Sequence, residues 1–170
     1  MIRSRISPGL LAVLLLAAPA AVAAQHDHAP SARADAAAPD QAQVRATLEA
    51  LFRAIETGDM AALDTLYAGD SLTVVEGAGI NRGWTDYREH HLAPELREMS
   101  GFQYRPAEIE AHVGVDLAWA LFRYTIRGRA GERDLDLVGR GTAILERRGS
   151  RWVVRHTQTS SRPRRTTDPG

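Results

Sequence analysis

The stretch Phe102–Ser160 decides the fold, and it reads FQYRPAEIEAHVGVDLAWALFRYTIRGRAGERDLDLVGRGTAILERRGSRWVVRHTQTS. It contains four runs rich in β-branched, aromatic and alternating apolar residues. Segments that contain glycine separate the runs, as in hairpin turns. The stretch therefore predicts an antiparallel meander with strands at about Phe102–His112, Leu117–Arg127, Asp134–Arg147 and Trp152–Ser160.

The residues before this stretch have the periodicity of helices. Apolar side chains recur at helical spacing between Asp40, which is suited to cap a first helix, and Gly58, which is suited to end it. Asp59 is suited to cap a short second helix. A third helix is expected over about 84–91, stopping before Pro94. Helices followed by an antiparallel sheet predict an α+β fold with the helices on one face of the sheet.

Residues 1–24 have the layout of a cleaved secretory signal. Arg3 and Arg5 precede an apolar run, and small residues follow it up to Ala23 and Ala24, either of which is suited to cleavage. The apolar run is shorter than the roughly 20 residues that a membrane-spanning helix needs. We therefore expect a secreted or periplasmic protein without stable membrane insertion after cleavage, the alternative being a retained anchor.

The segment after the signal is rich in Ala, Asp and Pro and contains His26 and His28. If cleavage follows Ala23, the free amine and His26 offer nitrogen ligands of the kind that bind Cu(II), the alternative being incidental histidines in a disordered tether. The expected organisation is a signal peptide (1–24), a disordered linker (25–40), one domain (41–162) and a disordered tail (163–170).

The composition excludes several chemistries. The chain has no cysteine and no lysine. Disulfides, thiolate metal sites, thiol nucleophiles and Schiff-base chemistry are therefore excluded. The 21 basic and 21 acidic residues balance, and the predicted signal contains two of the basic ones. No basic surface of the size that nucleic-acid binding needs is expected, and hence no nucleic-acid partner.

Four short motifs carry a resemblance to a known family: Glu56-Thr57-Gly58-Asp59, Leu66-Tyr67-Ala68-Gly69-Asp70, Gly83-Trp84 and Trp152-Val153-Val154-Arg155-His156. With the order of elements, they resemble the nuclear transport factor 2-like superfamily, which includes SnoaL-like polyketide cyclases and ketosteroid isomerases. The segment Gly83–Glu95 is similar to one in secreted members of unknown function. The resemblance implies a cone-shaped barrel, in which a strongly curved sheet wraps around the helices and encloses an apolar pocket. It also implies a small hydrophobic ligand and a homodimer formed through the outer face of the sheet.

The segment Gly83–Glu95, GWTDYREHHLAPE, is the densest in groups suited to acid–base work. Trp84, Tyr87 and His91 are spaced so that they share one helix face. His90 points elsewhere, beside Asp86, so the adjacent histidines lack the i, i+4 spacing of a helical zinc pair. His91 is either a pocket residue or a buried histidine hydrogen-bonded to a backbone carbonyl or a tyrosine.

Glu76 follows the short β-type run 72–75, and Asn81-Arg82 beyond it is expected to be loop. In ketosteroid-isomerase relatives a catalytic acid lies a few residues after a similar Tyr-Ala-x-Asp stretch, and Glu76 is the nearest acid here, one place later than usual. It is either a pocket carboxylate whose pKa is raised by desolvation, acting as a general base, or an exposed acid at a strand end.

The last strands supply further candidates. Strict alternation would place Trp152, Val154, His156 and Gln158 on one face, either as a pocket wall or as a strand end in solvent. Arg123 either lies in the cavity, where it would fix a carboxylate or enolate oxygen, or on the outer face.

Two function classes follow. The first is a binding protein that holds a small hydrophobic ligand without turnover. The second is an isomerase, cyclase or dehydratase that needs no metal or organic cofactor. In either class we expect catalytic or pocket roles for Glu76, His91 and His156, and ligand contacts from Trp84, Tyr87, Arg123 and Gln158. Metal binding through His26 and His28 is a third, separate hypothesis.

Overall fold

The computed structural model describes the backbone of residues 31–168 and the side chains of residues 38–168. The predicted signal and the two histidines His26 and His28 lie outside the described residues. In chain order the elements are α1 (Ser31–Thr57), α2 (Met60–Leu66), a 3₁₀ turn η1 (Gly69–Ser71), β1 (Thr73–Glu76), β2 (Gly79–Arg82), α3 (Trp84–Tyr87), a π-helical turn η2 (Arg88–Leu92), α4 (Ala93–Glu98), β3 (Met99–Val113), β4 (Leu117–Ala130), β5 (Arg133–Arg148) and β6 (Arg151–Pro163).

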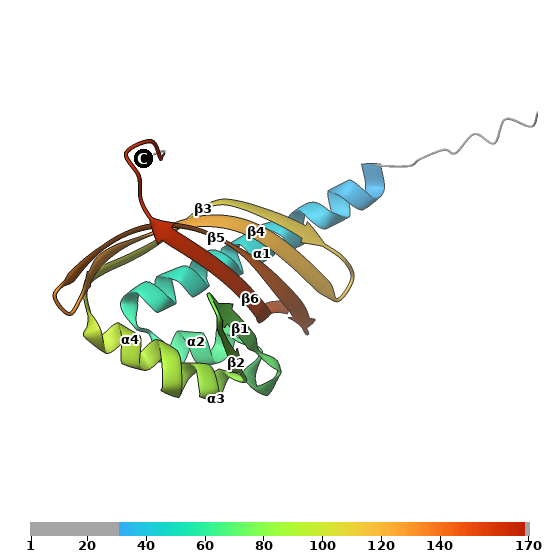
Figure 1. The fold of residues 1–170 in the computed structure, drawn as a ribbon. Helices are drawn as coiled ribbons and strands as arrows, with labels where there is room; N and C mark the ends of the chain where they lie inside the picture. Colours follow the sequence, from blue (N-terminus) through green and yellow to red (C-terminus); the bar gives the residue numbers. More distant parts are fainter. Residues whose placement is uncertain (1–30, 169–170) are drawn as a thin grey trace, which may run out of the picture.

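The six strands form one curved sheet in the order β2-β1-β6-β5-β4-β3. Figure 1 shows this sheet arching over α1, with α2, α3 and α4 on the same, concave side. The predicted α+β cone is confirmed, and so are the four long strands, which pair as successive antiparallel hairpins. Within the described part of the chain, no helix is both long and apolar enough to cross a membrane.

The short strands β1 and β2 complete the sheet. They pair with each other as an antiparallel hairpin, and β1 also runs parallel to β6. The expectation that Asn81-Arg82 is loop is therefore wrong, because Asn81 pairs with Val74 and Arg82 with Thr73. Gly77 turns the hairpin with a φ of 57°, which glycine adopts at little cost.

The first helix begins earlier than expected. Asp40 lies inside α1 and does not cap it, since α1 starts at Ser31. Both carboxylate oxygens of Asp40 instead accept hydrogen bonds from the Arg147 guanidinium of β5, at 3.2 and 2.6 Å. Residues 31–40, which were expected to belong to the linker, are thus helical. At the other end, Gly58 ends the helix and Asp59 caps α2 by accepting a hydrogen bond from the Ala62 amide, as predicted.

The core lies between the concave face of the sheet and the helices. Alternation along β4 places Phe122 and Tyr124 inside, and their rings lie over Gly139 and Gly141 of β5, where any side chain would collide with them. Arg123 therefore points to the outer face. The buried set includes Val44, Leu48, Phe52, Leu63, Leu72, Val74, Ala118, Ala120, Phe122, Tyr124, Leu145 and Val154.

A β-bulge divides β6 into two halves, and the alternation of inward and outward side chains is reversed between them. The pairing with β5 shifts between Leu145↔Val154 and Ile144↔His156, so that Arg155 is an extra residue. Trp152 and Val154 face the core before the bulge, and Thr157 does so after it. The prediction that His156 and Gln158 share a face with Trp152 is therefore wrong, because one added residue reverses the alternation.

The third helix does not stop before Pro94, as the sequence predicted. It continues through η2 and α4 to Glu98. A proline cannot donate to the carbonyl four residues earlier and would clash with it in a regular helix. Here the wider π-helical turn absorbs the proline: the Ala93 amide bonds to the Arg88 carbonyl, five residues back, and Pro94 occupies the first turn of α4.

Candidate functional site

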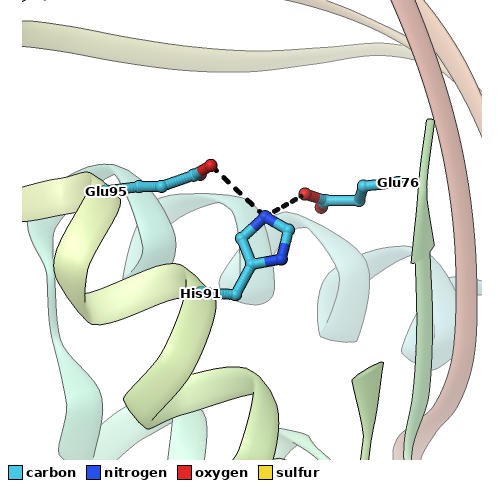
Figure 2. Close-up of side chains that lie close together, drawn as sticks. All are labelled: Glu76, His91 and Glu95. Atoms are coloured by element: carbon cyan, nitrogen blue, oxygen red, sulfur yellow. Dashed lines mark ion pairs between the residues drawn. The ribbon is translucent and has the colours of Figure 1, made fainter. Parts of the chain in front are cut away.

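Three acid–base side chains from separate elements meet at one point: Glu76 at the end of β1, His91 in η2 and Glu95 in α4. His91 Nε2 lies 3.0 Å from Glu76 Oε2 and 3.3 Å from Glu95 Oε1. Figure 2 shows the imidazole between the two carboxylates, with this one nitrogen directed at both. We call these three residues the Glu–His–Glu cluster.

The opposite edge of the His91 ring is fixed by an amide. His91 Nδ1 lies 2.9 Å from Asn81 Oδ1. Asn81 Nδ2 donates to Asp86 Oδ2 at 3.0 Å, which sets the amide so that its oxygen faces the ring. Because an amide oxygen only accepts, Nδ1 of His91 carries the hydrogen, and Nε2 is left to face the carboxylates.

Glu76 lies in an environment that resists ionisation. Burial raises the pKa of this carboxyl above its usual value, His91 counteracts the shift and the nearby Glu95 reinforces it. Tyr87 donates its hydroxyl to Glu76 Oε1 at 3.2 Å. Burial also raises the pKa of Tyr87, so that this phenol remains a donor. Glu76 is therefore a desolvated carboxylate with one partner on each oxygen.

A pocket of about 260 Å³ opens beside the cluster. Burial raises the pKa of both Tyr104 and Tyr124, which keeps their phenols protonated, so that each has a hydrogen to donate. Apolar side chains make up much of the wall. The lining residues are Ile55, Glu76, Gly77, Tyr87, Leu92, Glu95, Leu96, Met99, Phe102, Tyr104, Tyr124, Ile126, Thr159, Ser160 and Ser161.

Four of the residues proposed from the sequence lie elsewhere. Trp84 is packed in the core against Tyr67, and its indole nitrogen donates to Asp64 at 2.6 Å. Arg123 and Gln158 line a groove on the outer face of the sheet, where Arg123 pairs with Glu108 at 3.3 Å. His156 lies on that outer side as well, opposite Ile144. The predicted convergence of His156 with Glu76 and His91 is thus wrong, since the bulge at Arg155 turns His156 outward.

The other sequence candidates come together as described: Glu76, His91 and Tyr87 lie in one contact network. His90 pairs with Asp86 at 3.1 Å on the surface, as the helical spacing predicted. Sequence reasoning missed Glu95 and Asn81. Glu95 follows His91 by four residues, a spacing that places both on one helix face and could have revealed it.

The cluster offers one nitrogen and two carboxylate oxygens that all lie within 4.8 Å of one another. Such an arrangement can hold either of two things. One is a proton shared between His91 and a carboxylate, and the other is a cation bound by all three groups. Among the described residues, Glu76, His91 and Glu95 are the group whose ligand atoms lie close enough together to hold a metal ion.

The comparisons with known proteins agree with this architecture. The model of the SnoaL-like domain matches residues 44–163, the larger part of the chain. The chain belongs to the SnoaL-like domain family. Among curated proteins, none matches this SnoaL-like chain.

Solved structures show the same fold at low identity. A nuclear transport factor 2-like superfamily protein from Salmonella enterica is 18% identical to this SnoaL-like chain and superposes with a TM-score of 0.65. The match covers 76% of this chain and 94% of the Salmonella protein. A protein from Shewanella frigidimarina assigned as a ketosteroid isomerase is 21% identical, with a TM-score of 0.61. The match covers 67% of this chain and 91% of the Shewanella protein. A protein from Streptomyces avermitilis assigned as a dehydratase is 17% identical, with a TM-score of 0.65. The match covers 72% of this chain and 96% of the Streptomyces protein.

Proposed function

We propose that this SnoaL-like domain binds a small, largely apolar molecule in the pocket beside Glu76 and transfers a proton on it. The observation that carries the proposal is the 3.0 Å contact between His91 Nε2 and Glu76 Oε2 at the edge of a pocket lined by both apolar and hydroxyl-bearing side chains. Titratable groups with perturbed pKa values cluster at functional sites, and pockets with a few convergent polar groups are where such sites lie. The ketosteroid isomerase and dehydratase assignments of two structural neighbours support this reaction class.

The pocket residues divide the chemistry among them. The Glu76 carboxylate takes a proton from a carbon next to a carbonyl group of the ligand. Tyr104 or Tyr124 donates a hydrogen bond to the ligand oxygen, on which negative charge develops. In a ligand with a double bond next to that carbon, return of the proton from Glu76 to the far end of the conjugated system completes an isomerisation. In a ligand with a hydroxyl on the neighbouring carbon, that hydroxyl leaves with the proton as water, which completes a dehydration.

His91 acts on Glu76 from outside the pocket lining. In its protonated form it donates Nε2–H to Glu76 Oε2 and favours the ionised carboxylate against the effect of burial. Asn81 keeps the ring in the orientation that this contact requires. A partly buried base with such support is set to accept a proton once the ligand has displaced water from the pocket.

The first test looks for the ligand and for the proton transfer separately. Native mass spectrometry of freshly purified protein should show a retained small molecule. The protein should then catalyse deuterium uptake from D₂O at the carbon next to the carbonyl of small apolar ketones. Removing the base, as in Glu76→Gln, should lower this uptake about a hundredfold or more, the usual contribution of a general base.

Glu89→Gln is the matched control, because Glu89 is exposed in the same helical segment as His91 and should leave the uptake unchanged. A retained ligand with no deuterium uptake in any variant would restrict the function to binding without turnover. Uptake that survives Glu76→Gln would rule out Glu76 as the base.

Two further properties belong to the proposal. Export rests on the signal-like residues 1–24, and fluorescence of a fusion protein or fractionation of cells would test it.

A homodimer through the outer sheet face is supported by an apolar surface there, formed by Leu117, Trp119, Leu121 and Ile144, each at least 40% exposed. Apolar surface of this kind marks an interaction site when it is contiguous.

A further inference from the structure

We propose that the Glu–His–Glu cluster is a binding site for a divalent transition-metal ion of the zinc type. The ion would take the place of the proton that His91 shares with the carboxylates. The adjacent histidines His90 and His91 do not form the site. Its ligands come instead from one histidine and from two glutamates on different elements (Figure 2).

Two of the distances between the ligand atoms are close to those of a tetrahedral centre. Zinc bonds to histidine nitrogen and carboxylate oxygen are about 2.0–2.2 Å long, so neighbouring ligand atoms of a tetrahedron lie about 3.3–3.5 Å apart. His91 Nε2 lies 3.0 Å from Glu76 Oε2 and 3.3 Å from Glu95 Oε1. The ligand atoms of all three residues lie within 4.8 Å of one another, and the half-exposed Glu95 side chain has room to adjust to a bound ion.

The surroundings of the cluster match those of metal sites. Metal-bound histidines usually donate their other ring N–H to an oxygen, which fixes the tautomer. Asn81 Oδ1 accepts from His91 Nδ1, and Asp86 in turn orients the Asn81 amide. The ring nitrogen that faces the two carboxylates is therefore the one that is free to bind a metal.

The charges of the cluster also favour a dication. The carboxylates of Glu76 and Glu95 both lie against the same nitrogen of His91, so that two negative charges oppose each other when both are ionised. A divalent ion balances both charges. Because Glu76 and Glu95 both line the pocket, an ion bound by them would lie at its edge.

The donor set selects the class of metal. One imidazole and two carboxylates suit zinc and its first-row neighbours. Calcium takes six to eight oxygen ligands and magnesium keeps an octahedral shell of oxygens, so neither is matched by this site. The consequence for turnover rests on the proposed function: the metal occupies the base, so that Zn²⁺ should inhibit deuterium uptake.

The test is calorimetric titration of ZnCl₂ into the full chain after removal of chelator. His26→Ala and His28→Ala are included in the reference protein, so that the N-terminal histidines do not contribute. We expect one bound Zn²⁺ per chain, and a loss of affinity of at least tenfold in both His91→Asn and Glu95→Gln. Co²⁺ should give the visible absorption of a four-coordinate site, and CaCl₂ should give no binding heat.

His90→Asn and Glu98→Gln are the matched controls, because both residues are exposed and lie one and three positions from a ligand. They should bind Zn²⁺ like the reference. The metal site is overturned if the reference binds no Zn²⁺, if Glu95→Gln binds it equally well, or if Ca²⁺ binds as tightly. Since Zn²⁺ binding is measured without a substrate, its absence would leave the proposed proton transfer standing. Absence of deuterium uptake would likewise leave the metal site standing.

Discussion

Asn81 determines which nitrogen of His91 faces the two carboxylates. Its amide is held from behind by Asp86, which also accepts the Arg82 backbone N–H at 3.0 Å. These donors lower the pKa of Asp86, with the Asn81 contact as the largest cause, so this carboxylate remains ionised. An aspartate near the surface thus controls, through one amide, the ring orientation on which the proposed proton transfer depends.

Replacing this amide should change the chemistry of His91 more than it changes stability. In Asn81→Ala, the preference for the Nδ1–H tautomer should disappear from the ¹⁵N NMR spectrum of the ring, and deuterium uptake should fall about tenfold, the effect typical of lost second-shell support. Arg82→Ala is the control, because only its backbone takes part. An unchanged tautomer in Asn81→Ala would contradict the positioning role.

Sequence reasoning reached the residues of the site unevenly. Glu76 and His91 could be singled out, because each lies in a recognisable local pattern. Asn81 could not, since its role depends on the pairing of β2 with β1, two strands of four residues in a segment with several turn-forming residues. Short strands of this kind owe their structure to their neighbours more than to their own sequence.

At the scale of elements, two irregularities decide which side chains reach the pocket. The bulge at Arg155 exchanges the two faces of β6, and the π-helical turn carries the helix of His91 past Pro94 to bring Glu95 into the cluster. Neither irregularity has a sequence signature as strong as the alternation or helical periodicity that it interrupts. The strands and helices were therefore predictable from the sequence, while the faces of their later halves were not.

The ion pair between α1 and β5 should make stability depend on pH. Arg147 holds the pKa of Asp40 below its usual value, so the pair stabilises the fold above the unfolded-state pKa of about 3.9 and this contribution is lost as the pH falls through that value and below. Asp40→Asn should therefore lower the free energy of unfolding at pH 7, and the difference from the wild type should shrink towards pH 3. Urea unfolding at a series of pH values measures it.

Asp134→Asn is the control for this ion pair, because Asp134 is exposed and lies 3.9 Å from Arg129, at the limit of an ion pair. Its effect on stability should be small at every pH. A difference between Asp40→Asn and the wild type that stays constant from pH 7 to pH 3 would show that the stabilisation does not come from the ionised carboxylate.

At the scale of the whole molecule, the outer face of the sheet governs the proposed assembly. Trp119 is 48% exposed at its centre and stacks on His112 at a ring distance of 4.0 Å. The change Trp119→Glu should convert a dimer to a monomer in sedimentation experiments, because it places a charge in an apolar contact. Val115→Glu, in the β3–β4 turn, should leave the dimer intact. A wild-type protein that sediments as a monomer at tens of micromolar would refute the interface.

The parallel pairing of β1 with β6 also bears on when the cluster can form during folding. Glu76 lies opposite Thr159, more than eighty residues further along the chain. Contacts of such long range form late and slow the folding of a domain. His91 and Glu95 are synthesised well before β6, the strand that pairs with β1 and so helps to place Glu76. The cluster therefore depends on a pairing that becomes available only when nearly the whole domain has been synthesised.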